Sequence, residues 1–336
     1  MKSYIDRLPG VLVTSALGVV AWLGARLLAA AFPHAAVDAV VLAILGGIVL
    51  RGWWMPGERT APGVAFAAKE MLEVAIVLLG VSTDMRFMAR AGGTLAASIA
   101  AITTLALGAG LLWGRCFRLP PSHALLVASG NAICGNSAIA AVASVTGARR
   151  EETASAVAYT AVLSLALVLA LPVVRAFLEL SDLRYGVATG LTVYAVPQVL
   201  AAAYPVSVQA GQIGTLVKLV RVLMLVPLVL LLSLRQHRSR NEGWRTVPLG
   251  RLVPWYVMGF LVAAVFRSSG MVNDAWAGAA QLTSHWLTII SMAALGLGVE
   301  MELLRRVGWR TAATATLSLL TLCAMAGILV AWLPAT

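Results

Sequence analysis

Long apolar runs with almost no charge recur along this chain, and they restrict its fold more than any other feature. Two of them are LAASIAAITTLALGAGLLW (95–113) and LMLVPLVLLLSL (223–234). Such runs approach the roughly 20 residues that a helix needs to cross about 30 Å of hydrocarbon. Only 12% of the residues are charged, whereas soluble domains carry about 25%. The pattern predicts an all-α polytopic membrane protein.

Charged residues, prolines and glycines divide the chain into eleven predicted transmembrane helices. The approximate ranges are 11–31, 36–55, 64–83, 93–114, 122–145, 152–178, 184–204, 206–234, 252–268, 275–299 and 311–333. No small-residue cleavage site follows the first run, so we interpret it as a retained helix and not as a signal peptide.

The number of helices suggests an internal repeat. We predict one extra N-terminal helix in 1–35, a first five-helix repeat in 36–180 and a second in 181–336. Because each repeat has an odd number of helices, the second would be inserted upside down, as in many secondary transporters. This register pairs the fifth helix with the tenth. A competing match, between 79–97 and 295–313, implies an offset of seven helices and does not tile the chain.

The distribution of Lys and Arg predicts the orientation. One side collects 17 of them: Lys2, Arg7, Arg51, Arg59, Lys69, Arg115, Arg118, Arg175, Arg184, Arg235, Arg238, Arg240, Arg245, Arg251, Arg305, Arg306 and Arg310. The other side collects six: Arg26, Arg86, Arg90, Arg149, Arg150 and Arg267. The positive-inside rule then predicts a bacterial inner-membrane protein with a cytoplasmic N-terminus and a periplasmic C-terminus. The net charge of +11 is explained by these short loops, so no nucleic-acid partner is expected.

The stretch GNAICGNS (130–137) is unusual for a membrane helix. Gly130 and Gly135 weaken the helix, and Asn131, Asn136 and Ser137 are costly in hydrocarbon. Non-helical backbone at membrane depth is tolerated where it is buried in protein or lines a wet cavity. We therefore predict a helix break at Gly130 and a substrate site here, with an anion at the N-terminus of the half-helix that resumes at Ser137. The alternative is close helix packing through small residues.

A second break is predicted in TGLTVYAVPQVLAAAYP (189–205). Pro197 removes one backbone donor and leaves carbonyls near Val193 and Tyr194 unpaired. Gln198 lies beside this break and is a candidate substrate ligand. A proline kink without a site is the alternative.

Two cations lie inside the eighth predicted helix. Lys218 and Arg221 are three residues apart and share one helix face. A cation near the bilayer centre costs about 3 kcal/mol, so it normally faces the protein interior and has a partner. We predict that both bind the substrate. The alternative is a structural ion pair with Glu70 or Glu73, which are also the candidate proton-coupling residues.

These segments resemble the sulfate exporter family of bacterial inner-membrane proteins. The likeness lies in SGNAICGNSAIAA (129–141), in VPQVLAAAYPVS followed by VKLVRVLMLVPLVLLL (196–232), and in LLGVSTDMRF (78–87). The family is placed near the cation/proton antiporters and bile-acid symporters. The resemblance implies inverted five-helix repeats, broken helices that cross near the midplane, and anion transport. The chain departs from the family pattern at Tyr194 and Ala195, where the pattern has His-Glu.

The leading functional hypothesis is a secondary transporter of a small anion (sulfate, sulfite, or an organic sulfonate or carboxylate), with proton coupling as an option. A passive anion channel and, less favoured, an intramembrane enzyme are the alternatives. No nucleophile–base pair, metal motif or phosphate-binding loop is evident, so we expect no enzyme activity, no cofactor and no metal. The three cysteines are scattered singly. Besides the anion, membrane lipid is the expected partner, with a homodimer left open.

Overall fold

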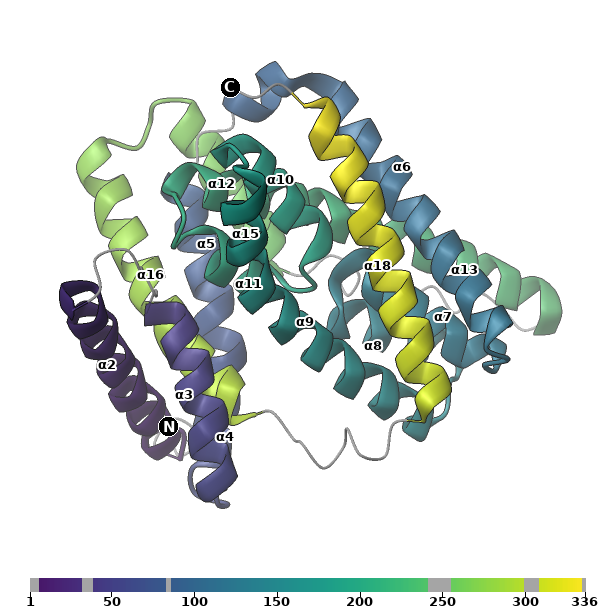
Figure 1. Ribbon diagram of the computed structural model, residues 1–336, viewed down its shortest axis with the longest axis horizontal. Coiled ribbons are helices and arrows are strands. Elements are labelled where there is room, and N and C mark those ends of the chain that lie inside the picture. Colours follow the sequence, from purple (N-terminus) through teal and green to yellow (C-terminus); the bar gives the residue numbers. More distant parts are fainter. Residues whose placement is uncertain (1–5, 32–38, 83–85, 241–254, 299–307, 334–336) are drawn as a thin grey trace. The chain divides into compact units, whose positions relative to one another are not determined.

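The chain folds almost entirely into helices. The computed structural model describes residues 6–31, 39–82, 86–240, 255–298 and 308–333, and all regular structure in these ranges is helical (Figure 1). Five described helices are long and apolar enough to cross a membrane, and they fall in 8–28, 93–116, 150–178, 208–233 and 309–332. These findings confirm a helical membrane protein. That the predicted ranges other than 122–145 and 184–204 cross the membrane stays a prediction, and those two are described below.

The described residues form two compact units, and both are discontinuous in sequence. The first unit takes residues 1–87 and 255–299, and the second takes 88–254 and 300–336. Each unit therefore draws on both of the predicted repeats. The repeat boundaries at 35/36 and 180/181 stay predictions.

The first unit is a helical bundle in which glycines allow close contacts between helices, for example between α3 and α16. Its helices are α2 (Leu8–Ala31), α3 (Ala39–Trp53), α4 (Ala61–Phe66), the π-helix η1 (Ala67–Met71), α5 (Leu72–Ser82), α15 (Trp255–Ser268) and α16 (Asp274–Leu297). Helix α16 packs on α3 and α5. A Cβ at Gly47 would lie 2.5 Å from the Ala293 carbonyl oxygen, so only glycine allows the α3 and α16 backbones to approach this closely.

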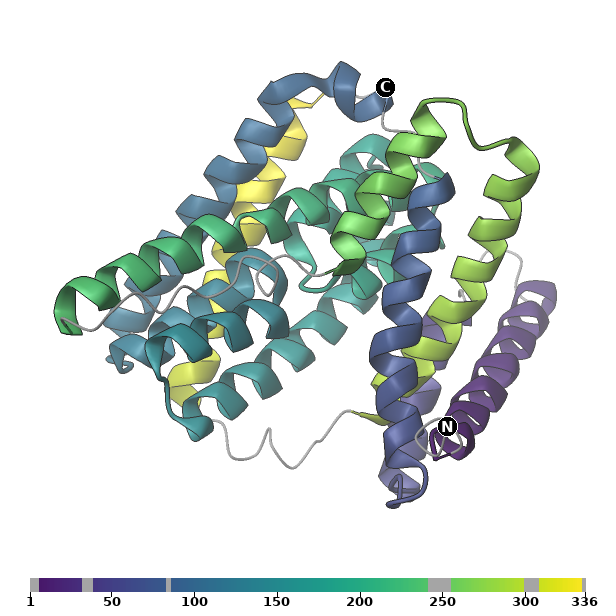
Figure 2. The same cartoon turned by 180° about the vertical axis from the view of Figure 1, so that it is seen from behind.

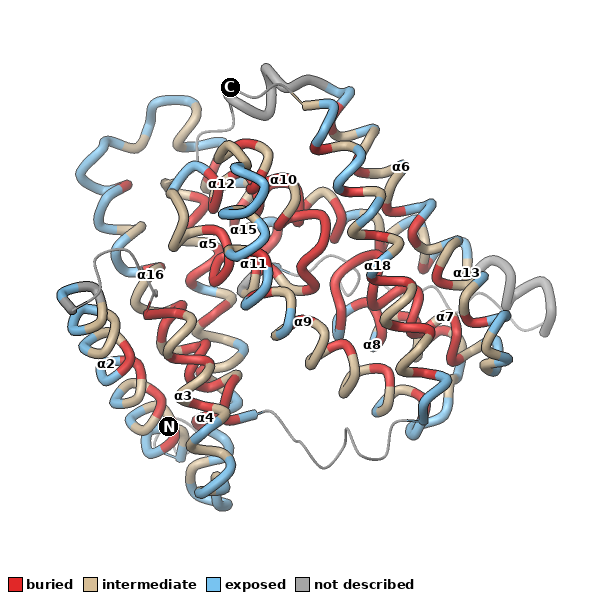
Figure 3. Tube along the Cα trace, in the orientation of Figure 1, coloured by how far each residue is buried: buried red, intermediate tan, exposed pale blue. Residues whose placement is uncertain are grey.

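The second unit combines long helices with two pairs of short ones. The long elements are α6 (Arg86–Cys116), α9 (Arg150–Leu178), the consecutive pair α12 (Val208–Leu223) and α13 (Leu225–Arg240), and α18 (Trp309–Trp332). The short elements are α7 (Pro121–Ser129), the π-helix η2 (Gly130–Cys134), α8 (Asn136–Thr146), α10 (Asp182–Thr192) and α11 (Val196–Ala203). Buried residues concentrate on the short helices and on α12 (Figure 3).

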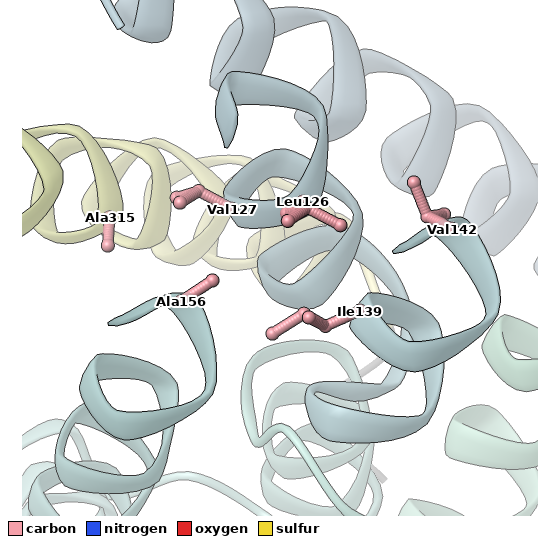
Figure 4. Close-up of a cluster of buried hydrophobic side chains, with 6 residues drawn as sticks. All are labelled: Leu126, Val127, Ile139, Val142, Ala156 and Ala315. Carbon is pink, nitrogen blue, oxygen red and sulfur yellow. The ribbon is translucent and has the colours of Figure 1, made fainter. Parts of the chain in front are cut away.

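The elements α7, η2 and α8 form a hairpin, which we call the first hairpin. Leu126 and Val127 of α7 pack against Ile139 and Val142 of α8, with Ala156 of α9 and Ala315 of α18 closing the cluster (Figure 4). At the open end of the hairpin, the Ser122 hydroxyl donates to Glu152 Oε2 at 2.9 Å, and Ser155 Oγ lies 3.0 Å from His123 Nε2. The beginning of α7 therefore lies beside the beginning of α9, where α8 also ends.

Helices α10 and α11 form the second hairpin. The Tyr185 hydroxyl near the beginning of α10 donates to the Ala202 carbonyl near the end of α11 at 2.7 Å. Its open end lies at the far end of α9, because Arg175 near the end of α9 forms a 2.8 Å ion pair with Asp182 at the beginning of α10. The two hairpins thus enter the second unit from opposite ends of α9 (Figures 1 and 2).

This arrangement corrects the prediction of broken helices that cross near the midplane. The predicted spans 122–145 and 184–204 are each a hairpin that returns to the end where it begins. The correction moves Arg149 and Arg150 to the more basic side and Arg175 and Arg184 to the other, so the totals of 17 and 6 stay unchanged. The predicted repeat pairs the fifth range with the tenth, through residues 294–300. These residues lie at the end of α16, which is continuous, and residues 299–300 are outside the described ones.

Cysteine accessibility can test the hairpin. Cys116 is exposed just before the first hairpin, and Arg150 is exposed just after it. We expect a membrane-impermeant maleimide to label Cys116 and an Arg150→Cys variant from the same side. A Glu179→Cys variant beyond α9 should be labelled from the opposite side, and Cys116→Ser provides the blank. Labelling of positions 116 and 150 from opposite sides would contradict the hairpin and show that the segment between them crosses the membrane.

Candidate functional site

The tips of the two hairpins meet inside the second unit. Gly135 turns the first tip with φ 61° and ψ −125°, a conformation that L side chains rarely adopt. A Cβ at Gly135 would lie 3.3 Å from the Tyr194 Cβ in the second tip. The Tyr194 hydroxyl donates to Asn131 Oδ1 at 2.9 Å, and Asn131 Nδ2 donates to the Ala315 carbonyl of α18 at 2.8 Å.

In each hairpin, one half-helix runs inward from the open end to the tip: α7 with η2 in the first hairpin and α10 in the second. Arg221 binds the C-terminal ends of both of these half-helices. Its Nε donates to the Ala132 carbonyl at 3.0 Å, and its Nη2 donates to the Asn131 and Ala132 carbonyls at 2.9 and 2.7 Å. Its Nη1 donates to the carbonyls of Gly190 at 3.0 Å, Leu191, and Val193 at 3.4 Å. Five carbonyls from two hairpins therefore converge on one guanidinium.

Lys218 makes the same connection one turn earlier on α12. Its Nζ donates to Ile133 of the first hairpin at 2.6 Å and to Val193 of the second at 2.8 Å. Both side chains are fully buried. Helix C-termini carry partial negative charge and unpaired carbonyls, so cationic donors stabilise them. The carbonyls predicted to be unpaired near Val193 thus have partners in α12.

The opposite, N-terminal ends of the outward-running half-helices lie along α9. Helix α8 begins at Asn136, whose Oδ1 lies 3.3 Å from the Thr160 hydroxyl. Helix α11 begins at Val196, and Gln198 Oε1 accepts from the Ala195 amide at 3.1 Å and from the Ser164 hydroxyl. Because Thr160 and Ser164 are four residues apart, the two points at which α9 contacts these half-helices are about 6 Å apart along its axis.

The positive partial charge at these N-termini is not balanced by an acidic residue in the first turn of either helix. The described contacts of Asn136 and Gln198 are with neutral groups. Asn136 and Ser137 are exposed. The N-terminal ends therefore present positive partial charge with no carboxylate cap, which favours an anion.

The structure brings together most of the predicted site residues. Asn131, Gly135, Asn136, Ser137, Gln198, Lys218 and Arg221 all belong to the two hairpins and α12. Gly130 is the first residue of η2, whereas the sharp turn is at Gly135. The second interruption is at Val193–Ala195, and Pro197 lies in the first turn of α11.

The predicted coupling residues belong to the other unit. Glu70 lies in η1 and Glu73 in α5. The Glu73 Oε2 atom accepts a hydrogen bond from Trp255 Nε1 at 2.6 Å. The pairing of Arg221 with Glu73 would join two separate units and stays a prediction. Among the residues that the structure describes, no group of three or more His, Cys, Asp or Glu side chains is arranged to hold a metal ion.

Sequence reasoning missed Thr160, Ser164 and Tyr194 as members of this site. A signal exists for the first two, since hydroxyl residues four apart share one face of an otherwise apolar helix. Tyr194 carries no such local signal, because its partner Asn131 is 63 residues away.

The carbonyl contacts predict a large effect of Arg221→Lys. A lysine has three donors and no planar fork, so several buried carbonyls would lose their partner, each at about 1–3 kcal/mol. We expect clearly reduced thermal stability of the purified protein. Arg175→Lys, at a partly exposed ion pair, is the matched control and should cost less than about 1 kcal/mol. Equal losses in the two variants would contradict this role of Arg221.

Comparisons with known proteins agree with a membrane protein. The family model described as "Conserved hypothetical protein 698" matches residues 9–315. A UPF0324 membrane protein of Bradyrhizobium diazoefficiens is 46% identical over 97% of this chain and 93% of the relative. UPF0324 membrane proteins of Agrobacterium fabrum and Bacillus cereus are 43% and 33% identical, over 94% and 80% of this chain and 90% and 79% of the relatives. The chain therefore belongs to the family of UPF0324 membrane proteins that the model "Conserved hypothetical protein 698" describes.

Proposed function

We propose that this protein is a secondary transporter that binds a small anion at the N-termini of α8 and α11. The proposal rests on one observation: the C-terminal and N-terminal ends of the half-helices have partners of different charge. The C-terminal ends are bound by Lys218 and Arg221, whereas the described side-chain contacts of the N-terminal ends are with neutral groups. In secondary transporters, half-helix N-termini point at anionic substrate groups and carbonyl ends hold coupling cations. In this protein Lys218 and Arg221 occupy the carbonyl ends, where such transporters hold a coupling cation.

The two hairpins support a carrier. Irregular backbone at membrane depth is tolerated where it is enclosed by protein or lines a cavity. Because the hairpins enter from opposite ends of the unit, the groups at their tips lie between two open ends that carry polar contacts, Ser122 with Glu152 at one and Arg175 with Asp182 at the other. A site in this position suits alternating access from the two sides of the membrane.

The donors at the N-termini favour a small oxyanion. The Gln198 side-chain oxygen is bound by the Ala195 amide and the Ser164 hydroxyl, so its amide nitrogen is the end that can donate to a ligand. Ser137 and Asn136 add exposed polar groups at the beginning of α8. We propose sulfate, sulfite, or an organic sulfonate or carboxylate as substrate. In this proposal Lys218 and Arg221 act on the anion indirectly, by holding the tips in place.

Further parts of the proposal concern coupling and location. The positive-inside count supports the bacterial inner membrane, with the N-terminus in the cytoplasm and the C-terminus in the periplasm. Proton coupling, if present, would involve Glu70 or Glu73. We propose a carrier and not an enzyme, with lipid as its surroundings and a homodimer as one option for its assembly.

Replacement of both Asn136 and Ser137 by Ala tests the site. We expect the double variant to fold and to lose most of the thermal stabilisation that sulfate gives the wild type. A ligand at 100 times its dissociation constant stabilises a two-state protein by roughly 2.7 kcal/mol. Ser144→Ala, at an exposed hydroxyl further along α8 that bonds to Ala141, should leave the stabilisation unchanged. Full stabilisation in the folded double variant would refute the site.

Exchange of labelled anion separates a carrier from a channel. Proteoliposomes loaded with unlabelled sulfate should take up labelled sulfate faster than empty ones, because a carrier returns more rapidly when loaded. Uptake that is independent of internal sulfate and rises linearly with its external concentration would favour the passive channel.

A further inference from the structure

Tyr194 occupies the position that separates the two helix N-termini. It directly precedes Ala195, the N-cap residue of α11, and a Cβ at Gly135, the N-cap residue of α8, would lie 3.3 Å from the Tyr194 Cβ. One side chain is therefore in contact with the beginning of one half-helix and is covalently linked to the beginning of the other.

The far end of the Tyr194 side chain is fixed as well. Its hydroxyl donates to Asn131 Oδ1 at 2.9 Å, and Asn131 is itself held by the Ala315 carbonyl of α18 at 2.8 Å. Tyr194 and Asn131 are 2% and 1% exposed. A buried aromatic ring with both ends fixed behaves as a rigid spacer, because close packing leaves it no other rotamer.

The backbone on either side of Tyr194 is also held. The Val193 carbonyl accepts hydrogen bonds from Lys218 and Arg221, and the Ala195 amide donates to Gln198 Oε1. The second tip is thus fixed on both sides of Tyr194, and the Tyr194 ring sets how closely Gly135 can approach it.

We infer that Tyr194 is a positioning residue that determines which anions this protein prefers, because its ring and its bond to Asn131 set the separation of the α8 and α11 N-termini. The inference rests on the proposed anion site. It assigns the size selectivity of that site to a residue that does not itself bind the anion. A smaller side chain at position 194 would let the two N-termini move relative to each other and admit a bulkier anion.

The test compares sulfate, methanesulfonate and benzenesulfonate as probes of increasing size. Dissociation constants come from the saturable thermal stabilisation of the purified full-length protein. In Tyr194→Leu we expect the ratio of the benzenesulfonate to the sulfate constant to fall about tenfold. In Tyr194→Phe, which keeps the ring and loses one hydrogen bond, we expect a fall of about threefold.

Tyr185→Phe is the matched control. Tyr185 also lies in the second hairpin, is fully buried and donates through its hydroxyl to a backbone carbonyl, but it lies near the open end and not at the tip. This variant should lose a similar amount of stability and keep the wild-type ratio. If Tyr194→Leu does not fold, the Tyr194→Phe result decides.

The outcomes separate this inference from the proposed function. Saturable binding in the wild type with the same ratio in the folded Tyr194 variants would overturn the inference alone. An equal change of ratio in Tyr185→Phe would also overturn it, since the effect would then be general loosening of the hairpin. Absence of saturable stabilisation of the wild type by all three anions would overturn the proposed function and this inference with it.

Discussion

The second unit depends on the hydrogen bonds from Arg221 to the carbonyls of both hairpins. Each hairpin turns around inside the protein, so its inward-running half-helix ends with unpaired carbonyls far from water. Leaving such groups unpaired costs about 1–3 kcal/mol each, and Arg221 alone binds five of them. The two hairpins come from opposite ends of the unit and share no sequence continuity at their tips. Arg221, together with Lys218 one turn earlier on α12, joins them.

Each hairpin is followed directly by a long helix that lies beside the tips. Helix α9 follows the first hairpin and α12 follows the second. Thr160 lies ten residues beyond Arg150, the first residue of α9, and Lys218 lies ten residues beyond Val208, the first residue of α12. At these equivalent positions, counted from the beginning of each long helix, α9 presents hydroxyls to the N-termini of the half-helices and α12 presents cations to their C-termini. The chemistry of each long helix matches the partial charge of the ends that it meets.

This division of charge would allow the proposed anion site to lie near two buried cations without direct contact. The guanidinium and ammonium groups are occupied by carbonyls, whereas Asn136 and Ser137 at the beginning of α8 are exposed. Uncharged donors bind an anion without the strong attraction of a direct ion pair. Such weaker binding would suit the proposed carrier, which would have to release its substrate on the far side of the membrane.

The sequence alone determined the helical membrane class, the approximate ranges of the helices, and the stretches that carry polar residues at membrane depth. These features follow from local composition: apolar length, charge spacing, and the glycines, asparagines and proline that interrupt a helix. The sequence also singled out Lys218 and Arg221, because a buried cation needs a partner wherever the chain goes.

Only the tertiary structure decided which groups those partners are and which way the chain runs at each break. A Gly-rich interruption has the same local signature whether the helix resumes in the same direction or turns back. The contacts that distinguish these cases, such as Ser122 with Glu152 and Tyr185 with Ala202, join residues 30 and 17 positions apart. The meeting of Asn131 with Tyr194 spans 63 positions. Such contacts depend on how half-helices pack in three dimensions, and no local pattern encodes that packing.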